Sequence, residues 1–197
     1  RRFNAVMQMT FGRPPRDLRR SAGATASRLT LRLPYRPPYD WTGVLAFLTR
    51  RAIPGVESVE NGVYRRTISL EGTQGIVEIR ATAEAFLLAT ITVDRLPALA
   101  AIVARLRHLF DLDADPEPIA SHLGRDPALA SRLAVRPGLR VPGAWDAFEL
   151  AVRATIGQQV SVSAASTLAG RLAATFGERL STPNSGRDLR VLFPEAK

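Results

Sequence analysis

The sequence has 197 residues, of which 46% are hydrophobic, so the chain is long enough to form one or two domains with a buried core. It contains no cysteine and only two histidines, His108 and His122, which excludes disulfide scaffolds, thiol nucleophiles and zinc sites of the Cys/His type. No apolar run reaches the length of a membrane span and no signal peptide is recognisable, so we expect a soluble, cytoplasmic protein.

Positive charge is concentrated at the start of the chain. The formal net charge is +9, and residues 1–36 carry nine arginines against a single acid, Asp17, so the remainder is nearly neutral. A basic end joined to a balanced body is typical of nucleic-acid contact, because arginine pairs with phosphate and releases counterions. Charge alone leaves a solubilising tail as the alternative.

The first twenty residues predict a helix that stops at Gly12 and is followed by a basic turn. The small, polar stretch at 21–27 is typical of a linker, and we expect a domain boundary there. Since Arg1 already lies inside the expected helix, we expect the chain to be a piece of a longer polypeptide.

Period-two alternation then predicts a strand whose buried face carries Leu29, Leu31 and Leu33. Asp40 is placed to cap a helix that runs to about Arg51. The strand-like runs that follow are separated by Gly62, by a turn at 72–75 and by a polar bend near Glu84. Their short connections predict an antiparallel meander.

A helix with Pro97 in its first turn is expected to run through Phe110. Strand, helix, meander and helix together predict an α+β layered domain over residues 28–112. Residues 113–141 are acidic and interrupted by proline, and we expect a connector there with two short helical pieces.

Acidic residues introduce this connector. Asp111, Asp113 and Asp115 alternate as they would at the start of a calcium loop. However, Pro116 and His122 occupy the positions at which such a loop needs glycine and glutamate. We therefore reject a calcium site and expect these acids to cap the next helix.

Two amphipathic helices are expected in the last unit, residues 142–197. The apolar stripe of the first consists of Trp145, Phe148, Val152 and Ile156. The second should be capped by Ser161 and stopped by Gly177. Its apolar stripe consists of Ala165, Leu168, Leu172 and Phe176. The last twenty residues show no usable periodicity.

The loop between these helices, IGQQVS at 156–161, places two glutamines at its tip. N–H groups at the start of the second helix attract phosphate, and a glutamine can both hydrogen-bond base edges and stack on them. The alternative is that Gln158 caps backbone groups inside the loop and Gln159 lies in solvent. The loop alone favours this alternative, because short motifs often match by chance.

Longer motifs place the loop in a wider context. They are PPYDW at 37–41 with Phe47 and Leu48 downstream, LFDLDADP at 109–116, RPGLRVPGAWDAFELAVRATIGQQVS at 136–161, and FGERL at 176–180. The stretch that contains them, from Leu29 to Leu180, resembles the N-terminal part of the AlkA-type 3-methyladenine DNA glycosylase II family.

The start of the chain carries a second, shorter resemblance, to the last helix of AraC-type helix-turn-helix regulators. The matching residues are Phe3, Met7, Phe11, Gly12, Pro15, Leu18 and Arg19. An AraC-type end ahead of an AlkA-type glycosylase resembles fusion proteins of the Ada type.

The AlkA-type resemblance implies a TATA-binding-protein-like antiparallel sheet with two helices at 28–112, followed by the first helices of an all-α helix-hairpin-helix glycosylase domain. It implies a DNA repair enzyme that flips alkylated purines such as 3-methyladenine out of double-stranded DNA and hydrolyses the N-glycosidic bond. The implied partner is DNA that contains alkylated bases, and the implied location is the bacterial nucleoid. We expect a monomer that uses no cofactor and no metal.

The same resemblance implies roles for particular residues. The DNA-binding residues are Gln158, Gln159, Val160 and Ser161. Gln159 matches the residue that fills the gap left by the flipped nucleotide, where the best-known member of the family has leucine. Phe47 matches an aromatic residue that helps to wall the base pocket, although it can equally be a core residue that faces the sheet.

The catalytic carboxylate and the phosphate-gripping hairpin of the family match no residues here and are expected downstream of Lys197. Asp40, Asp146 and Glu149 match non-catalytic positions, so we assign the chemistry to none of them and expect this chain to be inactive alone. The alternative is a DNA-binding transcriptional regulator of the adaptive response without glycosylase activity. A longer reading frame that encodes a hairpin and an aspartate would favour repair.

Overall fold

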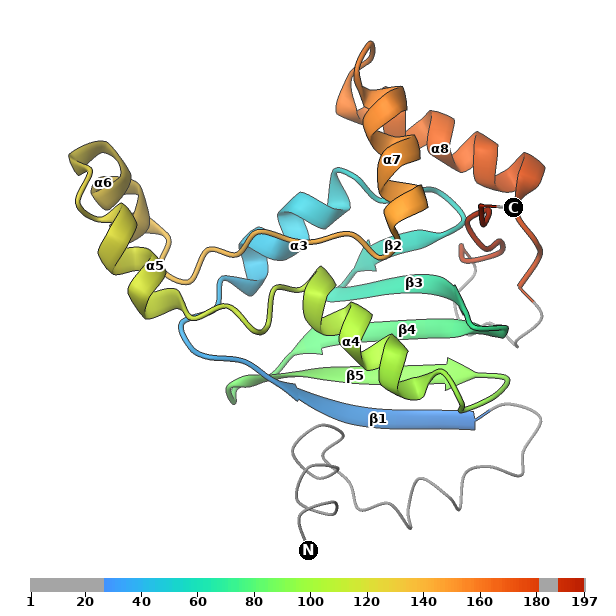
Figure 1. Cartoon of the computed structure of the whole chain (residues 1–197), viewed down its shortest axis with the longest axis horizontal. Helices are drawn as coiled ribbons and strands as arrows, with labels where there is room; N and C mark the ends of the chain where they lie inside the picture. The colour runs from blue at the N-terminus through green and yellow to red at the C-terminus, as the bar shows by residue number, and fades with distance from the viewer. Residues whose placement is uncertain (1–26, 181–187, 197) are drawn as a thin grey trace, which may run out of the picture.

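The computed structural model describes residues 27–180 and 188–196. The helix at 1–20 and the linker at 21–27 expected from the sequence lie outside this part of the chain, apart from Ser27. Five antiparallel strands form one sheet, and a helical hairpin and a two-helix arm extend from different sides of it (Figure 1). The α+β class expected from the sequence is confirmed.

The sheet has the strand order β1-β5-β4-β3-β2, so the later four strands form the expected meander and the first strand lies beside the last. Its strands are β1 (Ser27–Pro34), β2 (Glu57–Glu60), β3 (Val63–Leu70), β4 (Thr73–Ala81) and β5 (Phe86–Val93). The three leucines of β1 are buried and Arg28 and Arg32 are exposed, as the period-two pattern predicts.

Two-residue turns at 61–62 and 71–72 connect the hairpins, and both residues of each turn have positive φ. This geometry matches the twist of the flanking strands. The turn expected at 72–75 is therefore wrong in part, because β4 includes Gly75. A Cβ at Gly75 would lie 2.0 Å from the carbonyl oxygen of Thr92, so this glycine serves the close approach of two strands.

Helices α3 (Trp41–Thr49) and α4 (Leu99–Leu109) pack against the sheet and share one apolar core with it. Asp40 caps α3 as expected, since its carboxylate accepts a hydrogen bond from the N–H of Gly43 at 2.8 Å. Pro97 lies in the turn ahead of α4 and not in its first turn. The centre of the core is formed by Leu29, Leu31, Leu33, Tyr64, Val77, Ile79, Leu87, Ala89, Ile91, Ile102, Leu106 and Phe110.

The connector contains the two expected helical pieces, α5 (Pro116–Leu123) and α6 (Pro127–Val135). Asp115 caps α5, whereas Asp113 pairs with Arg107, so the expected capping role applies to only part of the acidic run. Within residues 27–180 and 188–196, no group of three or more His, Cys, Asp or Glu side chains is placed to hold a metal ion.

Helices α7 (Ala147–Gly157) and α8 (Val162–Phe176) form the hairpin. The apolar stripe expected for the first helix is wrong only in part: Trp145 is buried and Ile156 packs on an apolar cluster, but Phe148 is exposed and Glu149 is the buried residue of α7. The stripe expected for α8 is also wrong, because Phe176 is exposed and its buried residues are Ala169, Gly170 and Ala173. A Cβ at Gly170 would lie 3.0 Å from Pro54, so this approach admits only small residues.

The final described segment, residues 188–196, returns to the sheet. The N–H groups of Arg190 and Val191 donate to the carbonyl oxygen of Gly55 at 2.9 and 3.2 Å, and the hydroxyl of Thr67 donates to the carbonyl oxygen of Val191 at 2.8 Å. Nothing in the sequence pattern predicted this contact. No helix in the described part of the chain is long and apolar enough to cross a membrane.

Candidate nucleic-acid interface

The loop from Gln158 to Ser161 forms the tip of the α7–α8 hairpin, at the end away from the sheet (Figure 1). All four of its residues are exposed. Ser161 caps α8 as expected, because its hydroxyl accepts a hydrogen bond from the N–H of Ala164 at 3.3 Å. The structure therefore brings the four candidate DNA-binding residues together on one projecting surface.

The two glutamine side chains extend from this tip. The N–H of Gln158 donates to the carbonyl oxygen of Thr155 at 3.4 Å and ends α7. Both glutamines are exposed, and no hydrogen bond of either side chain is found among the described residues. Both amides can therefore meet an approaching ligand.

A notch of about 150 Å³ lies on the inner side of the loop. Its lining combines apolar and small residues of the hairpin with two arginines and consists of Arg51, Arg153, Gly157, Val160, Val162, Ala165, Ser166 and Ala169. Val160 of the tip thus borders the same space as Arg51, which follows α3.

Phe47 is half-buried on α3 and packs against the main core. The guanidinium of Arg51 lies 3.9 Å from the centre of its ring, a cation–π contact. Arg51 also lines the notch, so Phe47 contacts a side chain that borders the same space as Val160 of the loop. The structure shows Phe47 as a partner of the core, and its role in a base pocket stays a prediction.

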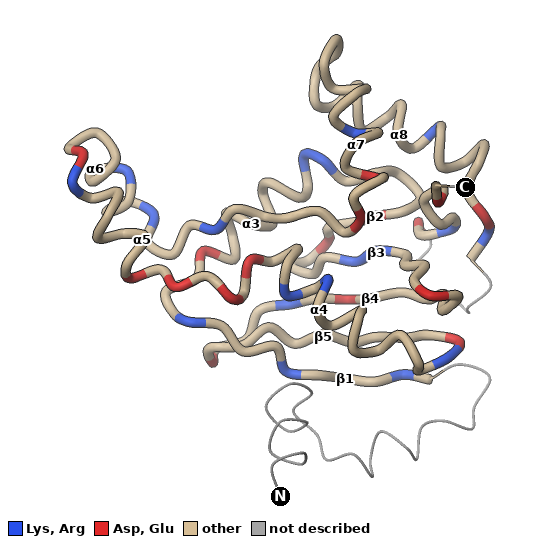
Figure 2. Tube along the Cα trace, in the orientation of Figure 1, with Lys and Arg blue, Asp and Glu red and all other residues tan. Residues whose placement is uncertain are grey.

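Charged residues of both signs lie on α7, β2 and β3 (Figure 2), and their side chains form ion pairs with one another. We call Glu57, Arg66, Glu149 and Arg153 the buried charge cluster. Arg66 bonds Glu149 at 2.7 Å and lies 3.5 Å from Glu57, while Arg153 bonds both glutamates at 2.6 Å. The side chains of Arg66 and Glu149 are 2% and 4% exposed.

The buried charge cluster is electrically balanced, with two carboxylates and two guanidinium groups. Burial raises the pKa of Glu149, but the positive charges of Arg66 and Arg153 outweigh this effect and hold the pKa below its usual value. Burial lowers the pKa of each arginine, and the glutamates more than compensate. Glu149, Arg66 and Arg153 are therefore charged at neutral pH.

Tyr64 extends the cluster into the core. Its hydroxyl donates a hydrogen bond of 2.6 Å to Glu57, and burial followed by the charge of Glu57 raises its pKa well above the ordinary value. The phenol is therefore neutral and acts only as a donor to Glu57. Sequence reasoning missed this cluster, since Arg66 and Glu149 lie 83 residues apart in the chain.

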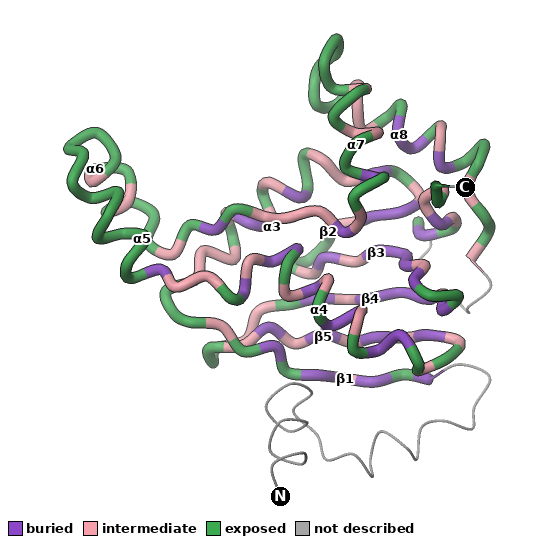
Figure 3. Tube along the Cα trace, viewed as in Figure 1, coloured by how far each residue is buried: buried purple, intermediate pink, exposed green. Residues whose placement is uncertain are grey.

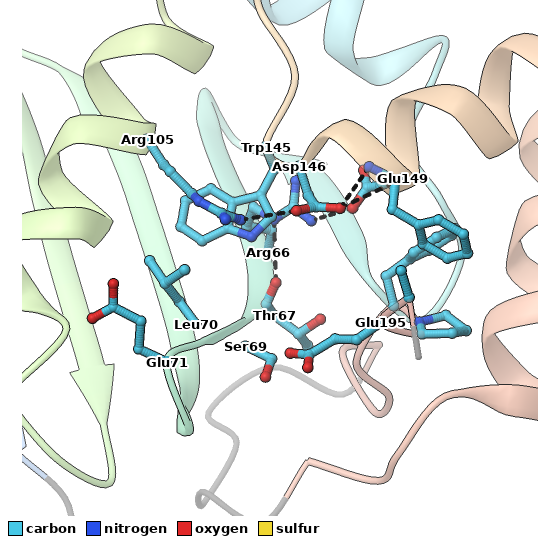
Figure 4. A pocket seen from close by; sticks show the side chains of 14 residues that line it. Arg66, Thr67, Ser69, Leu70, Glu71, Arg105, Trp145, Asp146, Glu149 and Glu195 are labelled. Atoms are coloured by element: carbon cyan, nitrogen blue, oxygen red, sulfur yellow. Dashed lines mark hydrogen bonds and ion pairs between the residues drawn. The ribbon is translucent and has the colours of Figure 1, made fainter.

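A cavity of about 310 Å³ lies beside the cluster (Figure 4). Trp145 lies in its wall, with the guanidinium groups of Arg66 and Arg105 at 4.9 and 5.5 Å from its ring centre. Arg105 also approaches Asp146 at 3.3 Å. Four of the charged residues in the lining, Arg66, Arg105, Asp146 and Glu149, are therefore already paired within the fold.

Each of the three carboxylates that the sequence left as non-catalytic has a structural partner. Asp40 caps α3 and pairs with Arg136 at 2.5 Å. Asp146 caps α7 by accepting hydrogen bonds from two N–H groups at 2.9 and 3.1 Å, and Glu149 belongs to the buried charge cluster. None of them is arranged as a general acid or base for a ligand in the notch.

A sheet joined to a helical hairpin in this way is a fold of DNA glycosylases. The chain superposes on the 3-methyladenine DNA-glycosylase from Archaeoglobus fulgidus with a TM-score of 0.69 and 23% identity, over 84% of this chain and 55% of that one. A structure of MBOgg1 in complex with a low-affinity DNA ligand superposes with a TM-score of 0.60 and 19% identity, over 87% of this chain and 52% of that one.

The family model of the AlkA N-terminal domain matches residues 30–146, and the chain belongs to this family. It is 42% identical over 184 residues to the "Probable bifunctional transcriptional activator/DNA repair enzyme AlkA" of Mycobacterium tuberculosis. This alignment covers 90% of this chain and 37% of that protein. It is 40% identical over 149 residues to the "DNA-3-methyladenine glycosylase 2" of Escherichia coli, which covers 75% of this chain and 51% of that protein. The chain thus spans about half or less of these relatives.

Proposed function

We propose that this chain is the N-terminal part of a bacterial DNA N-glycosylase that removes alkylated purines such as 3-methyladenine. The observation that carries the proposal is the exposed, capped tip at Gln158 to Ser161, in a chain 40% identical to a DNA-3-methyladenine glycosylase. The proposed partner is double-stranded DNA with alkylated bases, which the protein engages as a monomer on the nucleoid.

The proposed layout assigns one task to each part of the chain. Residues 28–112 form the supporting sheet domain, 113–141 the connector and 142–197 the start of the glycosylase domain that presents the tip. A remnant of an AraC-type helix-turn-helix at 1–20 precedes them. The catalytic carboxylate is not assigned to Asp40, Asp146 or Glu149, because each of the three is engaged elsewhere.

In this function the tip enters the duplex beside the flipped nucleotide, and Gln159 fills the space that it leaves. Unstacking a base step costs a few kcal/mol, which the inserted side chain offsets by stacking and by hydrogen bonds to the orphaned base. The exposed N–H groups at the start of α8 favour phosphate contact on either side. Phe47 is proposed to contribute to the wall that receives the flipped base.

The test uses a duplex with an abasic-site analogue opposite 2-aminopurine, a base whose fluorescence rises when it is unstacked. Wild-type chain should raise the fluorescence on binding, and Gln159→Ala should abolish the rise while affinity is retained, because phosphate contacts dominate affinity. Gln158→Ala is the matched control. A normal rise with Gln159→Ala and none with Gln158→Ala would show that the wedge is the other glutamine.

A second measurement separates the two candidate functions. The chain alone should release no 3-methyladenine from methylated DNA, whereas the Escherichia coli relative serves as the positive control. Release of 3-methyladenine by this chain would contradict the proposal that the catalytic carboxylate lies outside the described residues. Tight binding to one undamaged sequence, without any change in 2-aminopurine fluorescence, would favour the regulator.

A further inference from the structure

The α7–α8 hairpin is joined to the sheet domain by two contacts of different kinds. One is a small apolar cluster in which Ala169 and Ala173 of α8 meet Ile53 and Val56. The other is the buried charge cluster, through which α7 meets β2 and β3. Helix α7 adds only the partly buried Ile156 to the apolar cluster, so its contact with β2 and β3 is made mainly by charged groups.

Arg153 is the part of the charge cluster nearest to the tip, one helical turn before Gly157 ends α7. Its guanidinium donates to Glu57 on β2 at 2.6 Å, to Glu149 on α7 at 2.6 Å, and to the carbonyl oxygen of Arg51 after α3 at 2.7 Å. Because the planar guanidinium of Arg153 hydrogen-bonds three elements at once, the position of this side chain is fixed in three directions. The end of α7 is therefore tied to both β2 and α3.

Glu57 is the acceptor that makes this arrangement possible. Its two oxygens receive hydrogen bonds from the N–H of Ile53 at 3.0 Å, from the hydroxyl of Tyr64 at 2.6 Å, and from Arg153. Arg66 approaches the same carboxylate at 3.5 Å. With its side chain only 5% exposed, Glu57 has no competing solvent, so the four donors settle its orientation.

We propose that Glu57 is a positioning residue that holds the DNA-entering tip at a defined height and angle above the sheet domain, by fixing Arg153. The inference rests on the proposed function of the tip. Gln158 lies five residues after Arg153, about 7.5 Å along the helix axis, so a tilt of about 10° at Arg153 moves the tip by about 1 Å. Displacements of this size are enough to impair a site that depends on placement.

The arrangement fits positioning better than stabilisation. A buried ion pair contributes little net stability, because the loss of hydration offsets its attraction, and an apolar contact of the same volume would hold the hairpin as strongly. Hydrogen-bonded ions, however, accept only a narrow range of angles and distances, whereas apolar surfaces can slide. The buried charge cluster therefore does more to fix the orientation of α7 than to strengthen its attachment to the sheet.

The first arm of the test measures this orientation. Because the chain has no cysteine, spin labels at Thr155→Cys on α7 and Arg80→Cys on β4 report one distance across the joint. Glu57→Gln should broaden and shift that distance distribution at a temperature where circular dichroism shows a folded protein. Glu78→Gln is the matched control, because it removes the same charge from a pair with Arg65 on the sheet, away from α7.

The second arm uses the duplex with 2-aminopurine and unlabelled protein. Glu57→Gln should lose the fluorescence rise while it retains DNA affinity, and Glu78→Gln should keep both. If Glu57→Gln does not fold, Arg153→Lys replaces it, since lysine keeps the charge but not the planar fork.

An unchanged distance distribution in the folded variant would overturn the proposal, whatever the DNA result. A broadened distribution with an intact fluorescence rise would equally overturn it, because the tip would then act without being held. No rise with the wild-type chain would overturn the proposed function instead, and the distance measurement would still decide whether Glu57 orients α7.

Discussion

The sheet layer and the α5–α6 arm both carry many apolar residues, but only the sheet buries them (Figure 3). Leu87 and Ile91 on β5 are fully buried, whereas Leu129 and Val135 on α6 are 41% and 79% exposed. Helix α6 has no buried residue. In the described part of the chain, amphipathic segments thus contribute to a buried core only where a neighbouring element packs against their apolar face.

The contact between α7 and the sheet, which we call the joint, differs from both regions. It buries the charged side chains of the buried charge cluster, whereas the sheet buries apolar ones. Glu149 is 3% exposed, as deeply placed as many core leucines. The sheet tolerates small shifts of its apolar contacts, while the joint requires each donor to find its acceptor. The predictions below test this difference, beginning with the largest effect.

Glu149→Gln should cost about 3–5 kcal/mol of unfolding free energy at pH 7, because it leaves buried guanidinium groups without a full counter-charge. The pKa of Glu149 is lower in the fold than its usual value of 4.5, so its contribution is present above that pH and is lost as the pH falls further. Urea unfolding across this range should therefore show a flatter acid dependence in the variant. An equally steep dependence would contradict the assignment.

Leu87→Ala should cost about 2–5 kcal/mol, because it opens a cavity in a fully enclosed core. The same substitution at Leu129 on α6 should change the free energy of unfolding by about 0.5 kcal/mol or less, as for an exposed residue. Parallel urea titrations compare the two. Similar costs would mean that the arm is packed as tightly as the sheet.

Asp146→Ala should cost about 1 kcal/mol through loss of the α7 cap, and should lower the global melting temperature. Asp126 caps α6 in the same way, through N–H groups at 2.8 and 3.2 Å. Its replacement by alanine should accelerate amide exchange within α6 and leave the global melting temperature unchanged. A global shift would show that the arm unfolds together with the sheet.

Glu78→Gln should cost only about 0.5 kcal/mol, because its pairs with Arg65 and Arg28 are partly exposed to solvent. High salt should reduce even this difference, as expected for surface pairs. Thermal melts at low and high ionic strength measure both. A cost close to that of Glu149→Gln would remove the distinction between the joint and the sheet surface.

Local signals in the sequence predicted the parts of the fold that depend on near neighbours. The buried leucines of β1, the caps at Asp40 and Ser161 and the meander all follow from patterns within a few residues. The resemblance to AlkA-type glycosylases supplied the family, which the match over residues 30–146 shows.

The sequence failed where distant segments decide the environment. Phe148 was expected inside and is exposed, because the adjacent Glu149 meets Arg66 from β3. On α8 the approach of Pro54 selects Gly170, so the larger Phe176 faces outward. A helical stripe identifies the apolar face, but only the partner determines which face is covered.

The position of β1 beside β5 also has a consequence for the order of folding. Thr30 and Thr90 face each other across sixty residues, whereas β2 to β5 are joined by short connections. Closing the longer loop costs more entropy, so the meander can form before β1 pairs with its edge strand β5. The basic N-terminal stretch precedes β1 in the sequence, so we expect it to be joined to the strand that enters the sheet last.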